Sequence, residues 1–327
     1  PGRGRRGAAR PGLLSQSRSL AVEAQNGMSA WARVYGALRR ALTGRANRAV
    51  APGYPTEPAA PLAAATPVLD EYVDSFPTPQ NAVDAVAGWN TALPPAAGAS
   101  AGETAFYLDP RILWCIERFG DLAGRRILEL GPLEASHTYL MSQHNPEVIH
   151  AIEANKLSFM RCLVAKELLG LERARFMLGD FQKWLEQRED RYDLVVASGV
   201  LYHMRNPARL IELISRRTDA VYLWTHYYSD ELMPEGDHRR GAFTGRVEAQ
   251  EVAGITVRLH ERSYHQAWRH KNFCGGMHDT HVWMEKPDIV GLLQAYGFDT
   301  VEIAHEWLDH PQGPCMSVFA RRGAPLP

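Results

Sequence analysis

The chain has 327 residues, of which 45% are hydrophobic and 22% charged, values that are ordinary for a soluble globular protein. It contains no run of about 18 apolar residues, so we expect no membrane-spanning helix. The four cysteines stand alone without a C-x-x-C pair, which excludes a cysteine-built zinc site and favours a reducing, cytoplasmic setting.

The net charge of −1 hides an uneven distribution. Residues 1–50 hold ten arginines and one acid, Glu23, and the remainder holds 26 basic and 36 acidic side chains, a balance of −10. An acidic body is poorly suited to nucleic acid, which needs clustered Lys and Arg. Four interpretations of the basic head stay open: a transit peptide, an RNA-contacting arm, a disordered tail, or translated sequence upstream of a start at Met28.

The first third of the chain predicts little regular structure. We expect residues 1–67 to be a basic, flexible extension with a short amphipathic helix at 31–43, and residues 68–104 to be a helical lead-in and linker. Residues 105–327 then form the main domain. Its first helix begins after Asp109, a typical N-cap followed by Pro110, and ends at Gly120.

Strands and helices alternate through the main domain. The predicted strands are 126–130, 147–154, 174–180, 192–199 and 219–227, and the helices between them are 136–144, 156–170, 181–187 and 206–217. Strands that are apolar throughout and alternate with helices predict an α/β fold with a parallel sheet covered on both faces. A closing helix at 286–297 precedes two strands, 298–307 and 315–322, which we expect to pair antiparallel.

Residues 227–284, between the fifth strand and the closing helix, have a different composition. This insert contributes 58 of the 327 residues but six of the 13 histidines. Its segment GRVEAQEVAGITVRLHE alternates as a β-hairpin does. We therefore expect a lid or a wall of a substrate pocket.

Acidic and small residues stand where the predicted strands end. In open parallel sheets, ligands bind outside the carboxyl ends of the strands. Glu153 follows Gly131 by 22 residues, the spacing of a carboxylate that binds ribose hydroxyls. Asp180 is placed to accept from an adenine amine with Phe181 against the ring, although it also suits a helix N-cap. These positions indicate an adenosine ligand.

The loop after the first strand argues against a dinucleotide. Leu133 and Ala135 occupy the places of the later glycines that let such a loop approach a pyrophosphate, and the loop has no Lys or Arg. We expect Glu134 to direct negative charge toward any phosphate. A phosphate-free adenosine with a cationic centre, S-adenosyl-L-methionine, suits this loop better than a nicotinamide cofactor does, and its ammonium can pair with Glu129 or the loop.

Four segments resemble the successive motifs of class I S-adenosylmethionine-dependent methyltransferases: ILELGPLEASHT, VIHAIEAN, FMLGDF and YDLVVASGVLYHM. The resemblance covers about residues 105–226 and implies a Rossmann-like, mostly parallel seven-stranded sheet with an antiparallel last strand. The run GVLYHMRNP is locally similar to the tRNA wobble carboxymethyl-uridine-forming methyltransferases and their uncharacterised relatives. We expect cofactor contacts at Glu129, Gly131, Pro132, Leu133, Glu153, Ala154, Asp180, Phe181, Ser198 and Gly199.

Three histidines are candidates for the chemistry. His203 follows the fourth strand, whose end faces the transferred methyl group in this family, and a histidine is a suitable base for a hydroxyl or amine acceptor. The alternative for His203 is a turn cap that does not touch substrate. His278 and His281 in GGMHDTHVWM are candidates for a base or a substrate contact, with polar packing as the alternative. We predict no metal, because a third ligand is not apparent.

Aromatic side chains near the fifth strand and in the insert are expected to line an acceptor pocket: Tyr202, His226, Tyr227, Tyr228 and Trp283. The sequence thus predicts a methyltransferase that acts on an oxygen or nitrogen of a small molecule or glycan. Two alternatives stay open. One is a tRNA-modifying enzyme of the wobble-uridine type, and the other is a non-catalytic, methyltransferase-like binding module.

Overall fold

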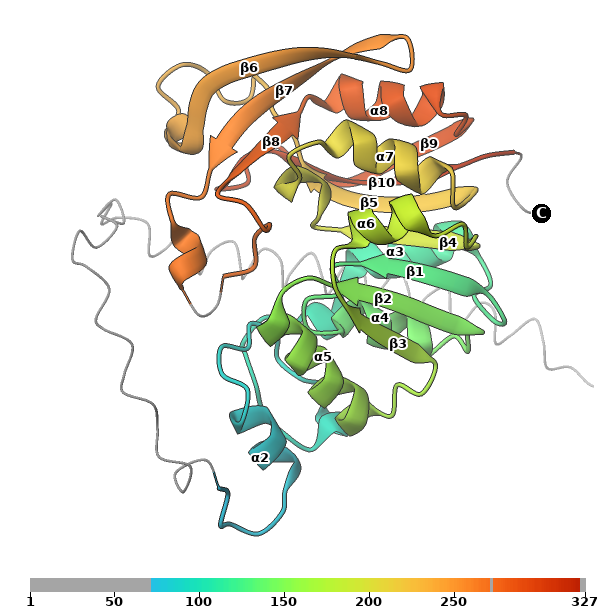
Figure 1. Ribbon diagram of the computed structural model, residues 1–327, viewed down its shortest axis with the longest axis vertical. Coiled ribbons are helices and arrows are strands. Elements are labelled where there is room, and N and C mark those ends of the chain that lie inside the picture. Colours follow the sequence, from blue (N-terminus) through green and yellow to red (C-terminus); the bar gives the residue numbers. More distant parts are fainter. Residues whose placement is uncertain (1–71, 271–272, 324–327) are drawn as a thin grey trace, which may run out of the picture. The chain divides into compact units, whose positions relative to one another are not determined.

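The computed structural model describes residues 72–270 and 273–323, and from Val73 onward they form one compact unit (Figure 1). The predicted basic extension and its amphipathic helix at 31–43 lie outside the described residues. Within the described part of the chain, no helix is long and apolar enough to cross a membrane.

A seven-stranded sheet forms the centre of the domain. Its strands are β1 (Arg126–Leu130), β2 (Val148–Glu153), β3 (Ala174–Leu178), β4 (Leu194–Ser198), β5 (Ala220–His226), β9 (Thr300–Trp307) and β10 (Cys315–Arg321). The order is β3-β2-β1-β4-β5-β10-β9. The first five strands are parallel, and β10 is antiparallel to both of its neighbours. The predicted Rossmann-like sheet is confirmed.

Five of the seven α-helices of the described residues begin after a side chain that accepts from a first-turn N–H group, whereas α4 and α8 have no such cap. The helices are α2 (Pro79–Asp84), α3 (Pro110–Phe119), α4 (Ser136–Ser142), α5 (Lys156–Leu169), α6 (Phe181–Gln187), α7 (Pro207–Ser215) and α8 (Lys286–Ala295). Asp109 accepts from the N–H of Arg111 at the start of α3, as predicted, and Asn155 caps α5 in the same way. These caps fix where the capped helices begin.

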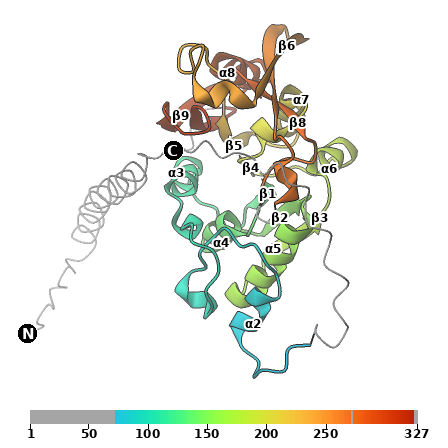
Figure 2. The same ribbon diagram turned by 90° about the vertical axis from the view of Figure 1, so that its left-hand side faces the viewer.

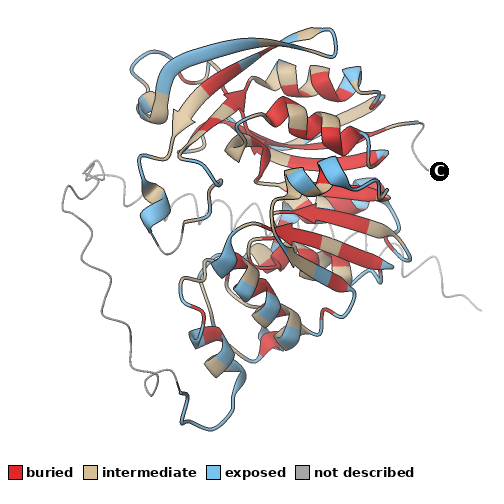
Figure 3. Ribbon diagram, viewed as in Figure 1, coloured by how far each residue is buried: buried red, intermediate tan, exposed pale blue. Residues whose placement is uncertain are grey.

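The helices cover both faces of the sheet (Figure 2). One hydrophobic cluster joins α7 and α8 to β4, β5 and β10, and a second joins α3 to the opposite face. Strand β10 is buried along its whole length, and β1 and β4 nearly so (Figure 3). The two-sided cover explains why these strands read as apolar throughout rather than alternating.

The insert forms a separate three-stranded antiparallel sheet of β6 (Phe243–Val252), β7 (Ile255–Ser263) and β8 (Thr280–Met284). The predicted hairpin is β6–β7, and it turns at Ala253 and Gly254, both with positive φ. Strand β8 was not predicted. It hydrogen-bonds back to the large domain through the N–H of Val282 and the carbonyl of Met204, which follows β4.

The lead-in contains α2 and a 3-10 turn at Pro95–Ala97. Thr91 and Thr104 form an isolated parallel bridge. Gly102 lies so close to the backbone of Asn90 that a Cβ there would be 2.3 Å from its carbonyl carbon. The lead-in therefore doubles back on itself before α3 begins.

Gly131, directly after β1, provides a test of how closely the turn after β1 packs against the segment after β4. Its φ is 67°, and a Cβ on it would lie 2.7 Å from a methyl carbon of Val200. We expect Gly131→Ala to lower the free energy of unfolding by about 2 kcal/mol, because a left-handed alanine is strained and the Val200 side chain must move. Chemical denaturation measures this loss.

Gly241→Ala is the matched control, because Gly241 has open space around it and no positive φ. An equal change in both variants would contradict the argument.

Candidate functional site

The loop that joins β1 to α4, residues 131–135, has left-handed backbone at alternate positions. Gly131, Leu133 and Ala135 have φ of 67°, 54° and 63°. Such values are uncommon for Leu and Ala and cost about 1–3 kcal/mol unless the surroundings hold them. Leu133 and Ala135 therefore adopt glycine-like backbone conformations at the two positions where a dinucleotide-binding loop has its later glycines.

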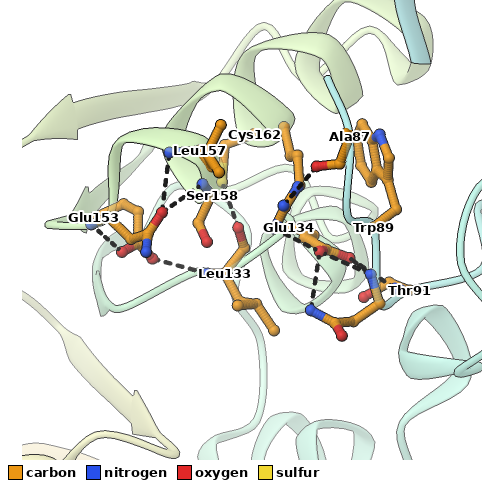
Figure 4. A network of polar contacts seen from close by, with 12 residues as sticks. Ala87, Trp89, Thr91, Leu133, Glu134, Glu153, Leu157, Ser158 and Cys162 are labelled. Atoms are coloured by element: carbon orange, nitrogen blue, oxygen red, sulfur yellow. Dashed lines mark hydrogen bonds and ion pairs between the residues drawn. The ribbon is translucent and has the colours of Figure 1, made fainter. Parts of the chain in front are cut away.

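Glu153, at the end of β2, holds this loop from one side. Its carboxylate accepts from the N–H of Leu133 at 3.1 Å and from the N–H of Asn155 at 2.7 Å (Figure 4). Burial raises the pKa of Glu153 to about 6, an effect that the backbone N–H donors partly oppose. Glu153 is thus a buried carboxylate poised near neutral pH beside the loop.

Glu134 holds the loop from the other side. Its buried carboxylate accepts from the N–H groups of Asn90 and Thr91 at 2.9 and 2.7 Å and pairs with the guanidinium of Arg161 at 3.2 Å (Figure 4). Arg161 is also buried and donates to the carbonyl of Ala87. The expectation that Glu134 directs charge at a ligand is wrong, because its carboxylate faces the lead-in and is neutralised there.

Glu129 is buried at the end of β1, behind the same loop. The Thr138 hydroxyl donates to its carboxylate, and within the described residues it forms no ion pair. Burial raises its pKa, whereas nearby His137 favours the ionised form. A cationic group arriving here would be stabilised by Glu129.

The remaining residues predicted to contact a cofactor lie at the carboxyl ends of the same strands: Pro132, Ala154, Asp180, Phe181, Ser198 and Gly199. Asp180 caps α6 by accepting from the N–H of Gln182 at 2.8 Å, so the N-cap interpretation describes this structure. Gly199 has φ of 81° and donates its N–H to the carbonyl of Trp224. The ten predicted positions thus share one edge of the sheet.

A second group of side chains, the histidine–aromatic cluster, lies at the carboxyl ends of β4 and β5 and on β8 and the segment before it, where the insert begins and returns. Its members are Tyr202, His203, Trp224, His226, Tyr264, His281 and Trp283. The Tyr202 ring lies 4.0 Å from that of His203 and 4.7 Å from that of His226, between centroids. Trp283 stacks on His226 at 4.9 Å. Five of the predicted chemistry and pocket residues meet here.

Tyr264 orients His203. The Tyr264 hydroxyl accepts from the N–H of Gly276 at 2.9 Å and hydrogen-bonds Nδ1 of His203. Nδ1 of His203 therefore has its partner in Tyr264, and which of the two atoms donates depends on the tautomer of His203.

The surroundings of this cluster favour neutral histidines. Burial, followed by neighbouring His281 and His226 and then Arg262, lowers the pKa of His203 well below its usual range. Burial and Arg262 lower the pKa of His281 to about 3, although Asp279 acts in the opposite direction. Burial likewise lowers the pKa of His226 to about 3, and its Nδ1 donates to the carbonyl of Gly313 at 2.9 Å.

Three predicted residues make their polar or stacking contacts elsewhere, although Tyr228 packs in one hydrophobic cluster with Trp283 and Tyr202. His278 is exposed. The Tyr227 hydroxyl donates to Glu306, and Tyr228 stacks on His260 with ring centroids 3.6 Å apart. In the described part of the chain, no group of three or more His, Cys, Asp or Glu side chains is arranged to hold a metal ion.

Arg111 and Tyr264 were not predicted. Arg111 lies over the Trp224 ring at 4.4 Å and makes a bidentate pair with Asp109, which also bonds His137 at 2.9 Å. The hydrogen bonds to Asp109 raise the pKa of Arg111 further above its usual value despite burial. No sequence pattern marked either residue as part of the site, because both lie far in sequence from the strand ends that they reach.

Comparison with known proteins identifies the family of this fold. Residues 110–303, more than half of the chain, match the model of a family described as Methyltransferase domain. The tRNA U34 carboxymethyltransferase of Idiomarina loihiensis is 26% identical over 133 residues. That match covers 40% of each chain, so this chain spans less than half of that relative's length.

Solved structures show the same fold. The N-terminal domain of EvdMO1, crystallised in the presence of SAH and D-fucose, has a TM-score of 0.51 and 22% identity, covering 69% of this chain and 86% of that one. The structure of EvdMO1 has a TM-score of 0.50 and 19% identity, covering 74% of this chain and 46% of the other. The resemblance to methyltransferases drawn from the motifs is confirmed.

The contact between Glu134 and Arg161 predicts a stability effect. Glu134→Gln leaves a buried guanidinium without a counter-charge, so we expect the free energy of unfolding to fall by about 3 kcal/mol. Hydrogen exchange of the Asn90 and Thr91 amides should quicken, because both donate to this carboxylate. Denaturation and exchange mass spectrometry measure the two effects.

Glu117→Gln is the control, because Glu117 is 69% exposed and its pair with Arg118 is a surface one. If Glu134→Gln were as mild as this control, the buried pair would not hold the lead-in.

Proposed function

Because this chain belongs to the methyltransferase-domain family, we propose that it transfers a methyl group from S-adenosyl-L-methionine to an oxygen or nitrogen atom of a small molecule or glycan. The observation that carries the proposal is the pairing of two sites at one sheet edge. The loop at residues 131–135 and its buried carboxylates suit the donor, and the histidine–aromatic cluster beside β4 suits an acceptor.

The residues of the first site fit this cofactor. Glu153 would accept from the ribose hydroxyls, and Asp180 and Phe181 would hold the adenine. Glu129 has no ion-pair partner among the described residues and is suited to the ammonium of the methionine part. The absence of Lys and Arg from residues 131–135 accords with a ligand that carries no phosphate.

When bound, S-adenosyl-L-methionine supplies an electrophilic methyl group on a sulfonium centre. The chain's own contribution is then placement, since much of the rate of such a displacement comes from holding the acceptor in line with the methyl group. Tyr202, His203 and Trp283 would position the acceptor, and neutral imidazoles would accept or donate its hydrogen bonds. His278 stays a prediction without a contact to support it.

A small acceptor is favoured over a polymer. The described body is acidic, whereas wrapping a nucleic acid needs clustered positive charge. The acceptor side is instead walled by aromatic rings, which bind sugar and aromatic rings alike. A neighbour of the same fold was crystallised with D-fucose present, and a sugar is accordingly one member of the class proposed here.

Modification of tRNA is the second candidate. It is supported by the match to the tRNA U34 carboxymethyltransferase and by the run GVLYHMRNP, which starts at Gly199. Electrophoretic binding to tRNA at low salt discriminates the two candidates. Salt-dependent binding that is lost when residues 1–50 are removed would favour tRNA, and no binding at low salt would exclude it.

The pKa of Glu153 predicts how cofactor binding depends on pH. Its pKa is raised to about 6, so the carboxylate that accepts from ribose is lost as the pH falls through that value. We expect the affinity for S-adenosylhomocysteine to fall about tenfold between pH 7.5 and 5, as calorimetry would measure. Glu153→Gln should bind weakly at both pH values and lose most of this dependence.

Glu167→Gln, an exposed change on α5, should behave as the unaltered protein does. Absence of S-adenosylhomocysteine binding by the unaltered protein at pH 7.5 would refute the proposed function.

A further inference from the structure

The face of β8 that carries His281 and Trp283 holds buried polar atoms without partners. The two side chains are 1% exposed and, two residues apart on a strand, point to the same side. Nε1 of Trp283 and both ring nitrogens of His281 complete no hydrogen bond of normal geometry in the described part of the chain, although the Asp279 backbone lies close enough to His281 to raise its pKa. Buried polar groups are nearly always paired, so three such atoms on one strand face indicate a missing partner.

The face is closed by residues from three other segments. The Tyr264 ring stacks on His281 with centroids 4.1 Å apart, and the His203 ring lies 6.1 Å from it. Tyr202 meets Trp283 edge-on at 6.0 Å. Nε2 of His203 has no hydrogen-bond partner among residues 72–270 and 273–323. The rings of His203 and His281 are thus neighbours, and Tyr202 links His203 to Trp283.

The charges around this face of β8 are not symmetric. The guanidinium of Arg262 lies 5.0 Å from the Trp283 ring centroid, and its field lowers the pKa values of His203, His226 and His281. The carboxylate of Asp279 is already held by Ser263 and by the N–H of Gln266. Arg262 acts on all three histidines, whereas the charge of Asp279 opposes it at His281 alone, so the surroundings of His203 and His226 disfavour an ammonium ion.

We propose that this face of β8 binds the methyl acceptor, that the acceptor is an uncharged ring bearing hydroxyl groups, and that the methyl group goes to one of its oxygens. The inference rests on the proposed function and narrows it. A hydroxyl both donates and accepts, and so it matches a set that contains the donor Trp283 Nε1 and the two ring nitrogens of a neutral His281, one of which donates while the other accepts. A carboxylate or phosphate would leave that acceptor unmatched.

The transfer balances with the groups present. A lone pair of the acceptor oxygen forms the new C–O bond while the C–S bond breaks, and its electron pair stays on sulfur as a neutral thioether. The hydroxyl proton becomes strongly acidic as the oxygen bonds to carbon. It passes to the unprotonated nitrogen of His281 and from there to water. A weakly basic histidine suffices for this late proton.

The experiment uses the full chain saturated with S-adenosyl-L-methionine bearing a labelled methyl group. Probe pairs share a ring and differ in hydroxyl against amine, for example D-fucose with a 4-amino analogue and benzyl alcohol with benzylamine. We expect transfer to the hydroxyl member of a pair. His281→Phe and Trp283→Phe should each lower the kcat/KM for that probe about tenfold or more, because each leaves a hydroxyl unpaired.

His238→Phe is the matched control, since the same substitution falls on a side chain of the insert that is 82% exposed. It should leave transfer unchanged. All three variants should bind S-adenosylhomocysteine within about twofold of the unaltered protein, which separates acceptor effects from misfolding. Trp283→Phe keeps an aromatic ring and removes the Nε1 donor, so it serves if His281→Phe does not fold.

Different failures point to different errors. A protein that does not bind S-adenosylhomocysteine overturns the proposed function. Three results with a protein that does bind it would overturn this inference and leave the cofactor assignment intact. The protein could prefer the amine probes, or it could neither bind nor methylate any hydroxyl probe at millimolar concentration. It could also keep its activity after both β8 substitutions.

Discussion

The rest of the site depends on the left-handed path of residues 131–135. Leucine and alanine do not adopt this backbone unaided, and two buried carboxylates hold it from opposite sides. Glu153 accepts from the loop's own N–H at Leu133, and Glu134 reaches out of the loop to Arg161 and the lead-in. The lead-in is therefore part of how the loop is shaped, although it lies far from the sheet edge in sequence.

The carboxylates of Glu134 and Glu153 differ in whether they are available to bind a ligand. Glu134 is neutralised by a buried guanidinium and by backbone N–H donors, so no ligand can recruit it without breaking the fold. Glu153 is held only by N–H groups, and burial leaves its pKa near 6. A ligand that offers hydroxyl donors to Glu153 favours the ionised form, so binding and ionisation reinforce each other.

The sheet and the donor side followed from the sequence because local patterns determine them. Apolar strands that alternate with capped helices specify the parallel sheet, and the carboxyl ends bring Glu129, Glu153 and Asp180 to one edge. The role of Glu134 was mispredicted, because its partners Asn90 and Arg161 are 44 and 27 residues away. Strand β8 was missed for the same reason. It is five residues long and is specified by its pairing with β7 rather than by its own pattern.

The acceptor side also depends on contacts between residues far apart in sequence, and these contacts require Gly276, which packs against the backbone of His203. A Cβ on Gly276 would lie 2.5 Å from the carbonyl oxygen of His203, so a residue with a side chain there would push the insert away from β4. The Gly276 N–H also donates to the hydroxyl of Tyr264, which hydrogen-bonds Nδ1 of His203. The close approach and the hydrogen bond that orients His203 thus depend on the same glycine. A change in the packing of the insert would alter both together, and the chemistry of the acceptor side is consequently a property of the insert rather than of the sheet that carries His203.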